Sequence, residues 1–91
     1  MSNKAVFLDR DGVINEDNPQ YTYTVEKFHI LPGVLEALAR LKSADYKLIV
    51  VTNQSGIAQG LYTREDVDKC HRYFQEQCKY AIDHYYYSPY H

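Results

Sequence analysis

Val6-Phe7-Leu8-Asp9-Arg10-Asp11-Gly12 is the stretch that decides the fold, because an apolar run stops there at two carboxylates. The run is apolar at successive positions, which predicts a strand over residues 4–9 that is buried on both faces, as in a covered parallel sheet. In an open α/β sheet, ligands bind beyond the carboxyl ends of the strands. The pattern therefore places Asp9 and Asp11 where a functional site is expected.

The two carboxylates repel each other unless a cation or a proton offsets their charge. Mg2+ fits this need, because it takes few carboxylates and completes its coordination with phosphate and water oxygens. Gly12 allows the backbone to turn sharply after the strand. The alternative is a solvated Asp-Arg-Asp-Gly turn without a ligand, and these residues alone leave both interpretations open.

A second apolar run, over residues 46–52, predicts another buried strand that is rich in β-branched residues. It ends in Thr52-Asn53-Gln54-Ser55-Gly56. Hydroxyl, amide and backbone N–H groups of such a loop can bind an anion. They can equally cap the local backbone, as Asn and Ser often do, so the spacing alone does not choose between the two roles.

Two motifs together resemble the haloacid dehalogenase (HAD) superfamily. Residues 7–15, Phe-Leu-Asp-Arg-Asp-Gly-Val-Ile-Asn, are similar to its first motif, and the second strand followed by Thr-Asn-Gln-Ser-Gly-Ile-Ala is similar to its second. Both have the form found in the branch of heptose-bisphosphate and histidinol-phosphate phosphatases. The resemblance implies an α/β fold with a three-layer Rossmann-like parallel sheet, of which residues 1–91 supply one incomplete domain, the first βαβαβ portion. The third and fourth motifs of the family, a lysine and acidic residues, would lie beyond residue 91.

The resemblance also implies a role for each residue at the two strand ends. Asp9 would attack phosphorus and form an aspartyl-phosphate, while Asp11 would protonate the leaving sugar oxygen and then deprotonate the attacking water. Asp9 and Asp11 are the expected Mg2+ ligands, Asp11 through its main-chain carbonyl. Thr52 and Asn53 would bind the phosphoryl oxygens.

Residues 13–30 lack a sustained periodicity and contain a turn signal at Asn18-Pro19, with a Thr/Tyr-rich portion at 21–25 that predicts a short strand or flap. A long loop directly after a candidate catalytic strand is often a lid or binding loop, and in the resembling family this region covers the site. Solvated turn residues are the alternative. The expected substrate contacts are Asp17, Asn18, Pro19 and Gln20, with Gln54 and Ser55 from the second loop.

The substrate class expected from the resemblance is a small phosphorylated sugar. The run from Asn53 to Thr63 favours a heptose bisphosphate, and histidinol phosphate is the runner-up. A non-catalytic binding or assembly module is a second hypothesis, because half of the family's site residues are missing and the chain alone is expected to be weakly active or inactive. A phosphoacceptor signalling domain is a weaker third hypothesis, since both carboxylates here lie at one strand end.

The remaining pattern completes the predicted βαβαβ order. A packing helix opens at Pro32-Gly33, with Pro32 near its first turn. A second helix starts at Thr63 with Asp66 as its capping partner, and residues 82–87 predict a third strand. With right-handed crossovers and a sheet that grows in one direction, both helices lie on one face. The other face and the edge of the first strand would then be open, which predicts marginal stability and self-association.

Composition narrows the partners further. The net charge of −2 and the lack of a Lys/Arg cluster argue against nucleic acid, and no apolar run approaches the length of a membrane span, so a cytoplasmic protein is expected. Cys70 and Cys78 are predicted to be ordinary thiols of a reducing compartment. The resembling phosphatases often carry a zinc loop where this chain has Ser88 and Tyr90, neither a usual ligand, so no zinc is expected.

Overall fold

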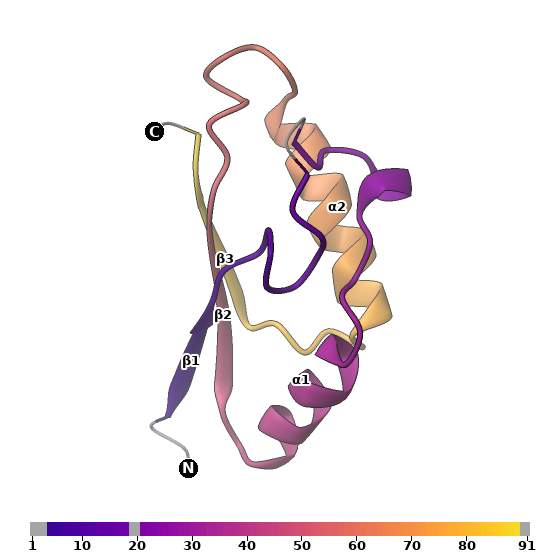
Figure 1. Cartoon of the computed structure of the whole chain (residues 1–91). Coiled ribbons are helices and arrows are strands. Elements are labelled where there is room, and N and C mark those ends of the chain that lie inside the picture. Colours follow the sequence, from indigo (N-terminus) through magenta and orange to yellow (C-terminus); the bar gives the residue numbers. More distant parts are fainter. Residues whose placement is uncertain (1–3, 19–20, 90–91) are drawn as a thin grey trace.

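Three parallel strands and two helices make up the computed structural model, which describes residues 4–18 and 21–89. The elements follow in the order β1 (Ala5–Leu8), η1 (Val25–Lys27), α1 (Val34–Ser43), β2 (Lys47–Asn53), α2 (Arg64–Gln77) and β3 (His84–Ser88). The sheet order is β1-β2-β3, and both helices lie on the same side of it (Figure 1). The predicted α/β class and the βαβαβ order are confirmed, and these residues supply two layers of the three-layer architecture.

Strand register brings the three carboxyl ends to one edge of the sheet. Leu8 of β1 is the partner of Val50, and Thr52 is the partner of Tyr87 in β3. Asp9 therefore follows β1 at the level of Val51, one residue before Thr52. This arrangement is what parallel pairing requires for polar loop residues from different strands to meet.

The core lies between the sheet and the helices. Leu48 and Val50 are completely buried in β2, and Leu38 of α1 packs with them from above the sheet. Each such side chain contributes roughly 1.5–3 kcal/mol by leaving water. Helix α2 contributes Val67, Cys70 and Phe74 to the buried core. The long loop contributes Ile14 and Phe28. The loop thus belongs to the core and is held firmly beside the strand ends.

Helix α2 begins where the sequence predicts, whereas α1 begins slightly later than predicted. Thr63 accepts the N–H of Asp66 at 3.2 Å, and the Asp66 carboxylate accepts the N–H of Thr63 at 2.9 Å, which is the predicted capping box of α2. Helix α1 begins only at Val34. Its N-cap is Gly33, whose φ of 84° suits glycine, so Pro32 precedes the helix instead of occupying its first turn.

The face of the sheet opposite the helices is uncovered. Phe7, Val51 and Tyr86 are 67%, 43% and 57% exposed there. The prediction that the first two strands are buried on both faces is therefore wrong for Phe7 and Val51, because both crossovers cover the same face. Among the described residues β1 pairs only with β2, so its other edge is open, as predicted from the topology.

The Thr/Tyr-rich portion of the long loop does not form a strand. Residues 21–24 carry no regular structure, and the single turn of η1 follows them. The rings of Tyr21 and Tyr23 pack instead on Tyr62, at centroid distances of 5.8 and 5.2 Å. Within the described part of the chain, no helix has the length and apolar character that a bilayer span requires.

Candidate functional site at the strand ends

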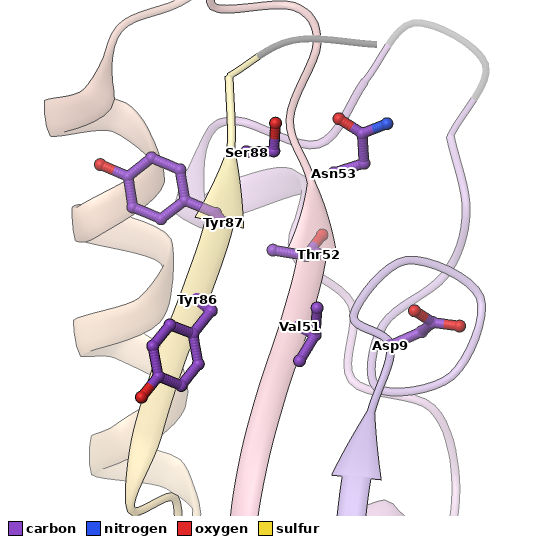
Figure 2. A pocket seen from close by; sticks show the side chains of 7 residues that line it. All are labelled: Asp9, Val51, Thr52, Asn53, Tyr86, Tyr87 and Ser88. Atoms are coloured by element: carbon purple, nitrogen blue, oxygen red, sulfur yellow. The ribbon is translucent and has the colours of Figure 1, made fainter.

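One cavity joins the ends of all three strands. It has a volume of about 580 Å³ and is lined by Asp9, Val51, Thr52, Asn53, Tyr86, Tyr87 and Ser88. Figure 2 shows Asp9 at the end of β1, across from Thr52 and Asn53 on β2. The structure thus brings the predicted nucleophile and the predicted phosphate-binding residues to one place, as neighbouring parallel strands require.

Asp11 is fixed by donors from three residues. Its Oδ1 atom accepts the Nη2–H of Arg10 at 2.8 Å and the Nδ2–H of Asn15 at 3.0 Å, with a longer bond of 3.2 Å from Arg10 Nε. Its Oδ2 atom accepts from Gln54 Nε2 at 3.2 Å. Because a carboxylate oxygen accepts hydrogen bonds, these N–H groups fix the orientation of the Asp11 side chain.

Arg10 places a positive charge beside Asp11. Its side chain is only 1% exposed, and Nη2 also donates to the carbonyl oxygen of Thr22 at 2.7 Å. The guanidinium carbon lies 5.4 Å from the centre of the Phe28 ring, a cation–π arrangement. An arginine buried in this way with its carboxylate partner ties the long loop to the segment that follows β1.

Gln54 connects the two strand ends. Its Nε2 atom donates both to Asp11 Oδ2 and, at 2.9 Å, to Thr52 Oγ1. Its Oε1 atom accepts the hydroxyl proton of Tyr62 at 2.7 Å, and its backbone N–H donates to the Ser88 carbonyl at 2.7 Å. The side chain is 2% exposed, so Gln54 is part of the wall of the site and not of its open surface.

Tyr62 is held tightly in this wall. It is 5% exposed, and a Cβ atom at Gly56 would overlap its ring, so glycine is what permits the close approach. Burial raises the pKa of the Tyr62 phenol, partly countered by the charge of Arg10. The hydroxyl therefore remains a donor at neutral pH.

The predicted substrate-contact residues fall into three groups. Asp17, Asn18 and Gln54 line a second cavity of about 220 Å³, together with Asp11, Tyr21, Thr22 and Asn53. Asn53 is shared by both cavities. Ser55 is half-buried and lines neither cavity, while Pro19 and Gln20 lie outside the described residues. The long loop and the second strand end therefore do meet beside Asp11.

The residues at the strand ends fit a magnesium ion with the coordination that is usual in proteins. No group of three or more His, Cys, Asp or Glu side chains in the described ranges could hold a metal by itself. Mg2+ does not need one, since it is usually held by one or two carboxylates together with phosphate and water. Asp9 is exposed in the larger cavity, whereas the Asp11 side-chain oxygens already accept N–H groups. Asp9 would thus be the carboxylate ligand.

The absence of zinc stays a prediction. Ser88 lies at the end of β3, and Tyr90 lies outside the described residues. His71 is buried at 6% exposure and stacks on Tyr85, so it is a packed side chain. Cys70 and Cys78 are free thiols.

Sequence reasoning missed three residues of this site: Arg10, Asn15 and Tyr62. Arg10 had a signal, because it is the only cation between the two carboxylates that need one. Asn15 follows Asp11 by four residues, and the tight turn in which Gly12 N–H donates to the Asn15 carbonyl at 2.7 Å returns it to the carboxylate. Tyr62 had no comparable signal, because its contact with Gln54 depends on how the 55–60 turns fold back.

The sequence of the whole chain is similar to sequences of known proteins. No family model matches it. It is 48% identical over 75 residues to the D-glycero-beta-D-manno-heptose-1,7-bisphosphate 7-phosphatase of Helicobacter pylori, which covers 82% of this chain and 43% of that protein.

Two solved structures are also similar. The first is the D,D-heptose 1,7-bisphosphate phosphatase of B. bronchiseptica, complexed with magnesium and phosphate, at a TM-score of 0.91 and 33% identity. The match covers 97% of this chain and 51% of that one. The second is a HAD-like phosphatase structure from Mesorhizobium loti, at a TM-score of 0.76 and 36% identity, covering 84% and 36%. The chain thus spans about half the length of the curated relatives it matches, or less.

Proposed function

We propose that this chain, which is related to the HAD-type heptose-bisphosphate phosphatases and matches their N-terminal half, provides the nucleophile and the phosphate-binding residues of a Mg2+-dependent sugar-phosphate phosphatase. One observation carries the proposal: Asp9, Thr52 and Asn53 line a single cavity at the ends of adjacent parallel strands. The proposed substrate is D-glycero-D-manno-heptose 1,7-bisphosphate, with loss of the 7-phosphate. The name of the relative from Helicobacter pylori supports this substrate, and the magnesium and phosphate bound to the structural neighbour from B. bronchiseptica support the metal and the phosphate site.

The first half of the reaction transfers the phosphoryl group to the protein. A carboxylate oxygen of Asp9 attacks phosphorus, and the bond between phosphorus and the sugar oxygen breaks. Asp11, protonated at that stage, gives its proton to the departing sugar oxygen. Thr52 and Asn53 orient the phosphoryl oxygens. Mg2+ bound beside Asp9 would reduce the repulsion between the carboxylate and the phosphate.

The second half returns the protein to its starting state. Asp11 takes a proton from a water molecule, the water oxygen forms a bond to phosphorus, and the bond between phosphorus and Asp9 breaks. The structure shows Asp11 with four N–H contacts to its two oxygens. These contacts hold the carboxylate that acts as the base in this step in a fixed orientation.

The proposed selectivity lies in the smaller cavity. Asp17 and Asn18 line it beside Asp11 and are proposed to accept or donate hydrogen bonds to sugar hydroxyls. Pro19, Gln20 and Ser55 remain proposed substrate contacts. Histidinol phosphate is the alternative substrate, and it would bring a cationic imidazole and amine in place of hydroxyls. The proposed location is the cytoplasm, which agrees with two free thiols.

The test is release of inorganic phosphate by the purified chain with MgCl2, on the heptose bisphosphate and on histidinol phosphate side by side. We expect weak turnover that disappears in Asp9→Asn. The matched control is Asp45→Asn, a carboxylate at an exposed turn with φ of 67°, a conformation that Asn also adopts readily. Turnover by Asp9→Asn equal to that of the wild type would end the nucleophile assignment, and faster turnover of histidinol phosphate would replace the substrate.

A non-catalytic assembly module is the second candidate function. It is favoured by the apolar face formed by Phe7, Val51 and Tyr86, which no described residue covers, and by the open edge of β1. A chain that neither turns over either substrate nor binds phosphate with Mg2+, but associates with itself, would support this candidate over the enzyme.

A further inference from the structure

We infer that Gln54 and Tyr62 are positioning residues, which together hold the Asp11 carboxylate in place and leave the Thr52 hydroxyl proton free for the phosphoryl group. This inference rests on the proposed function and assigns Gln54 a role inside the wall of the site, in place of contact with the sugar. Its basis is a continuous chain of hydrogen bonds from Tyr62 through Gln54 to both strand ends.

The Gln54 amide uses both of its N–H hydrogens within the site. Gln54 Nε2 lies 3.2 Å from Asp11 Oδ2 and 2.9 Å from Thr52 Oγ1. A primary amide has two N–H donors, so both are used within the site. One nitrogen therefore sets the distance between a residue that follows β1 and a residue of β2.

The amide of Gln54 has one orientation that suits its neighbours. The opposite orientation would place Gln54 Oε1 against the Asp11 carboxylate, where two acceptors would repel each other. It would also leave the buried Tyr62 hydroxyl facing an NH2 group. The observed orientation avoids this repulsion, and the Tyr62 hydroxyl donates to Oε1 at 2.7 Å. Tyr62 thus controls the direction of the amide without reaching Asp11 or Thr52 itself.

The contact with Gln54 also determines where the Thr52 hydroxyl proton can go. A hydroxyl has one donor and accepts through its lone pairs. Because Thr52 Oγ1 accepts an N–H from Gln54, its own proton is directed to another acceptor. Thr52 lines the larger cavity with Asp9, where the acceptor would be a phosphoryl oxygen. Gln54 therefore prepares Thr52 as a donor to the anion.

Packing around Tyr62 and Gln54 makes this series of hydrogen bonds rigid. The Tyr62 ring stacks on Tyr23 with a centroid distance of 5.2 Å and an interplanar angle of 8°, and it lies against the backbone of Gly56. The Gln54 backbone is tied to Ser88 of β3. Both ends of the connection are thus anchored in parts of the fold that do not belong to the reacting groups, as positioning requires.

The test measures binding of inorganic phosphate to the full chain in excess MgCl2, by 31P NMR, for the wild type and for Tyr62→Phe and Gln54→Leu. Loss of one neutral hydrogen bond predicts about fivefold weaker binding for Tyr62→Phe, and loss of both donors predicts about tenfold or more for Gln54→Leu. The control is Tyr85→Phe, which removes a half-buried hydroxyl that donates to the His71 carbonyl at 3.5 Å. It should bind phosphate within about twofold of the wild type.

A charge-sensitive variant separates positioning from simple space filling. Gln54→Glu keeps the shape of the side chain but offers a donor only when it is protonated. Its phosphate affinity relative to the wild type at the same pH should therefore rise as the pH is lowered from about 8 to about 6, since burial beside Asp11 favours the protonated acid. A ratio that is constant with pH would overturn the inference, as would folded Tyr62→Phe and Gln54→Leu chains that bind phosphate like the wild type.

A second readout keeps the inference apart from the proposed function. In the phosphate-free chain, the side-chain amide hydrogens of Gln54 should exchange slowly with solvent, and they should exchange faster in Tyr62→Phe but not in Tyr85→Phe, as seen by 1H–15N NMR. If the wild type fails to bind phosphate, the proposed function is refuted, and the exchange rates still decide whether Tyr62 fixes Gln54. Equal exchange in wild type and Tyr62→Phe would refute the positioning role.

Discussion

The imidazole of His71 stacks on the ring of Tyr85 with the centroids 4.3 Å apart and the planes 15° from parallel. Burial lowers the pKa of His71 to about 4, and the charge of Arg10 acts in the same direction. Its buried Nε2 atom has no hydrogen-bond partner among the residues that the structure describes. His71 is therefore neutral in the folded chain at pH values where it is protonated in the unfolded chain.

The first prediction is a loss of stability in mild acid that depends on His71. The unfolded pKa is about 6.5, so between about pH 6.5 and pH 4 the unfolded chain binds more protons. The free energy of unfolding should then decrease as the pH falls through this window, by up to about 3 kcal/mol. His71→Phe keeps the aromatic stack and should lose less stability. Urea unfolding at about pH 7.5 and pH 4.5 measures both, and equal losses in the two proteins would contradict the assignment.

The second prediction concerns Asp83, which anchors the segment before β3 to the start of β2. Its Oδ2 atom accepts the Leu48 N–H at 2.7 Å and the Lys42 Nζ–H at 2.8 Å. The hydrogen bond from Lys42, followed by that from Leu48, lowers the pKa of Asp83. Stability from this group is thus fully present above the ordinary pKa of 3.8 and decreases as the pH falls below it.

Two substitutions separate the contributions to this anchor. Asp83→Ala should cost about 1–2 kcal/mol, because a backbone N–H at the edge of the core loses its acceptor. Lys42→Ala should cost less than about 1 kcal/mol, since the ion pair is partly exposed to solvent. Chemical unfolding at neutral pH measures both changes. A greater loss for Lys42→Ala would show that the ion pair, and not the backbone contact, dominates.

The sequence was sufficient to predict the parallel sheet and the meeting of the strand ends. Long apolar runs predict strands that avoid water, and the crossover rule then fixes their direction. With the direction fixed, Asp9 and Thr52 had to share an edge, and they do. The helix start at Thr63 was equally predictable, because its capping box is a local contact over three residues.

Two features depended on long-range packing and could not be predicted. Phe7 was expected to be buried, but an apolar side chain does not reveal which face the rest of the chain covers. The contact between Tyr62 and Gln54 needs the turns at 55–60 to bring the ring back over Gly56, and turn sequences do not specify such a path. Arg10 is intermediate, since the need for a cation was evident but its burial under the long loop was not.

The third prediction tests the close approach at Gly56. Gly56→Ala places a methyl group where the Tyr62 ring lies, so the ring must move or the backbone must shift. The expected cost is about 1–3 kcal/mol of unfolding free energy, typical of overpacking. In the double variant Gly56→Ala/Tyr62→Leu the smaller side chain relieves the overlap. The two changes together should therefore cost less than the sum of the single ones, and strict additivity would mean that the ring does not cause the loss.

The fourth prediction concerns the uncovered face, for which we propose self-association. Phe7 is 67% exposed on β1, beside an open strand edge, and Val51 and Tyr86 extend the apolar surface across the sheet. Burying such a surface against a second copy removes apolar area from water. Light scattering of the wild type should therefore give a mass above that of the monomer, which increases with concentration.

Phe7→Lys should reduce that mass toward the monomer, because a charge would have to be buried in the interface. The matched control is Leu61→Lys, which places the same charge at a residue that is 50% exposed in the loop before α2, away from the open face. It should associate like the wild type. A wild-type chain that stays monomeric at every concentration would contradict self-association. Equal effects of the two lysines would instead show that net charge, and not the sheet face, controls assembly.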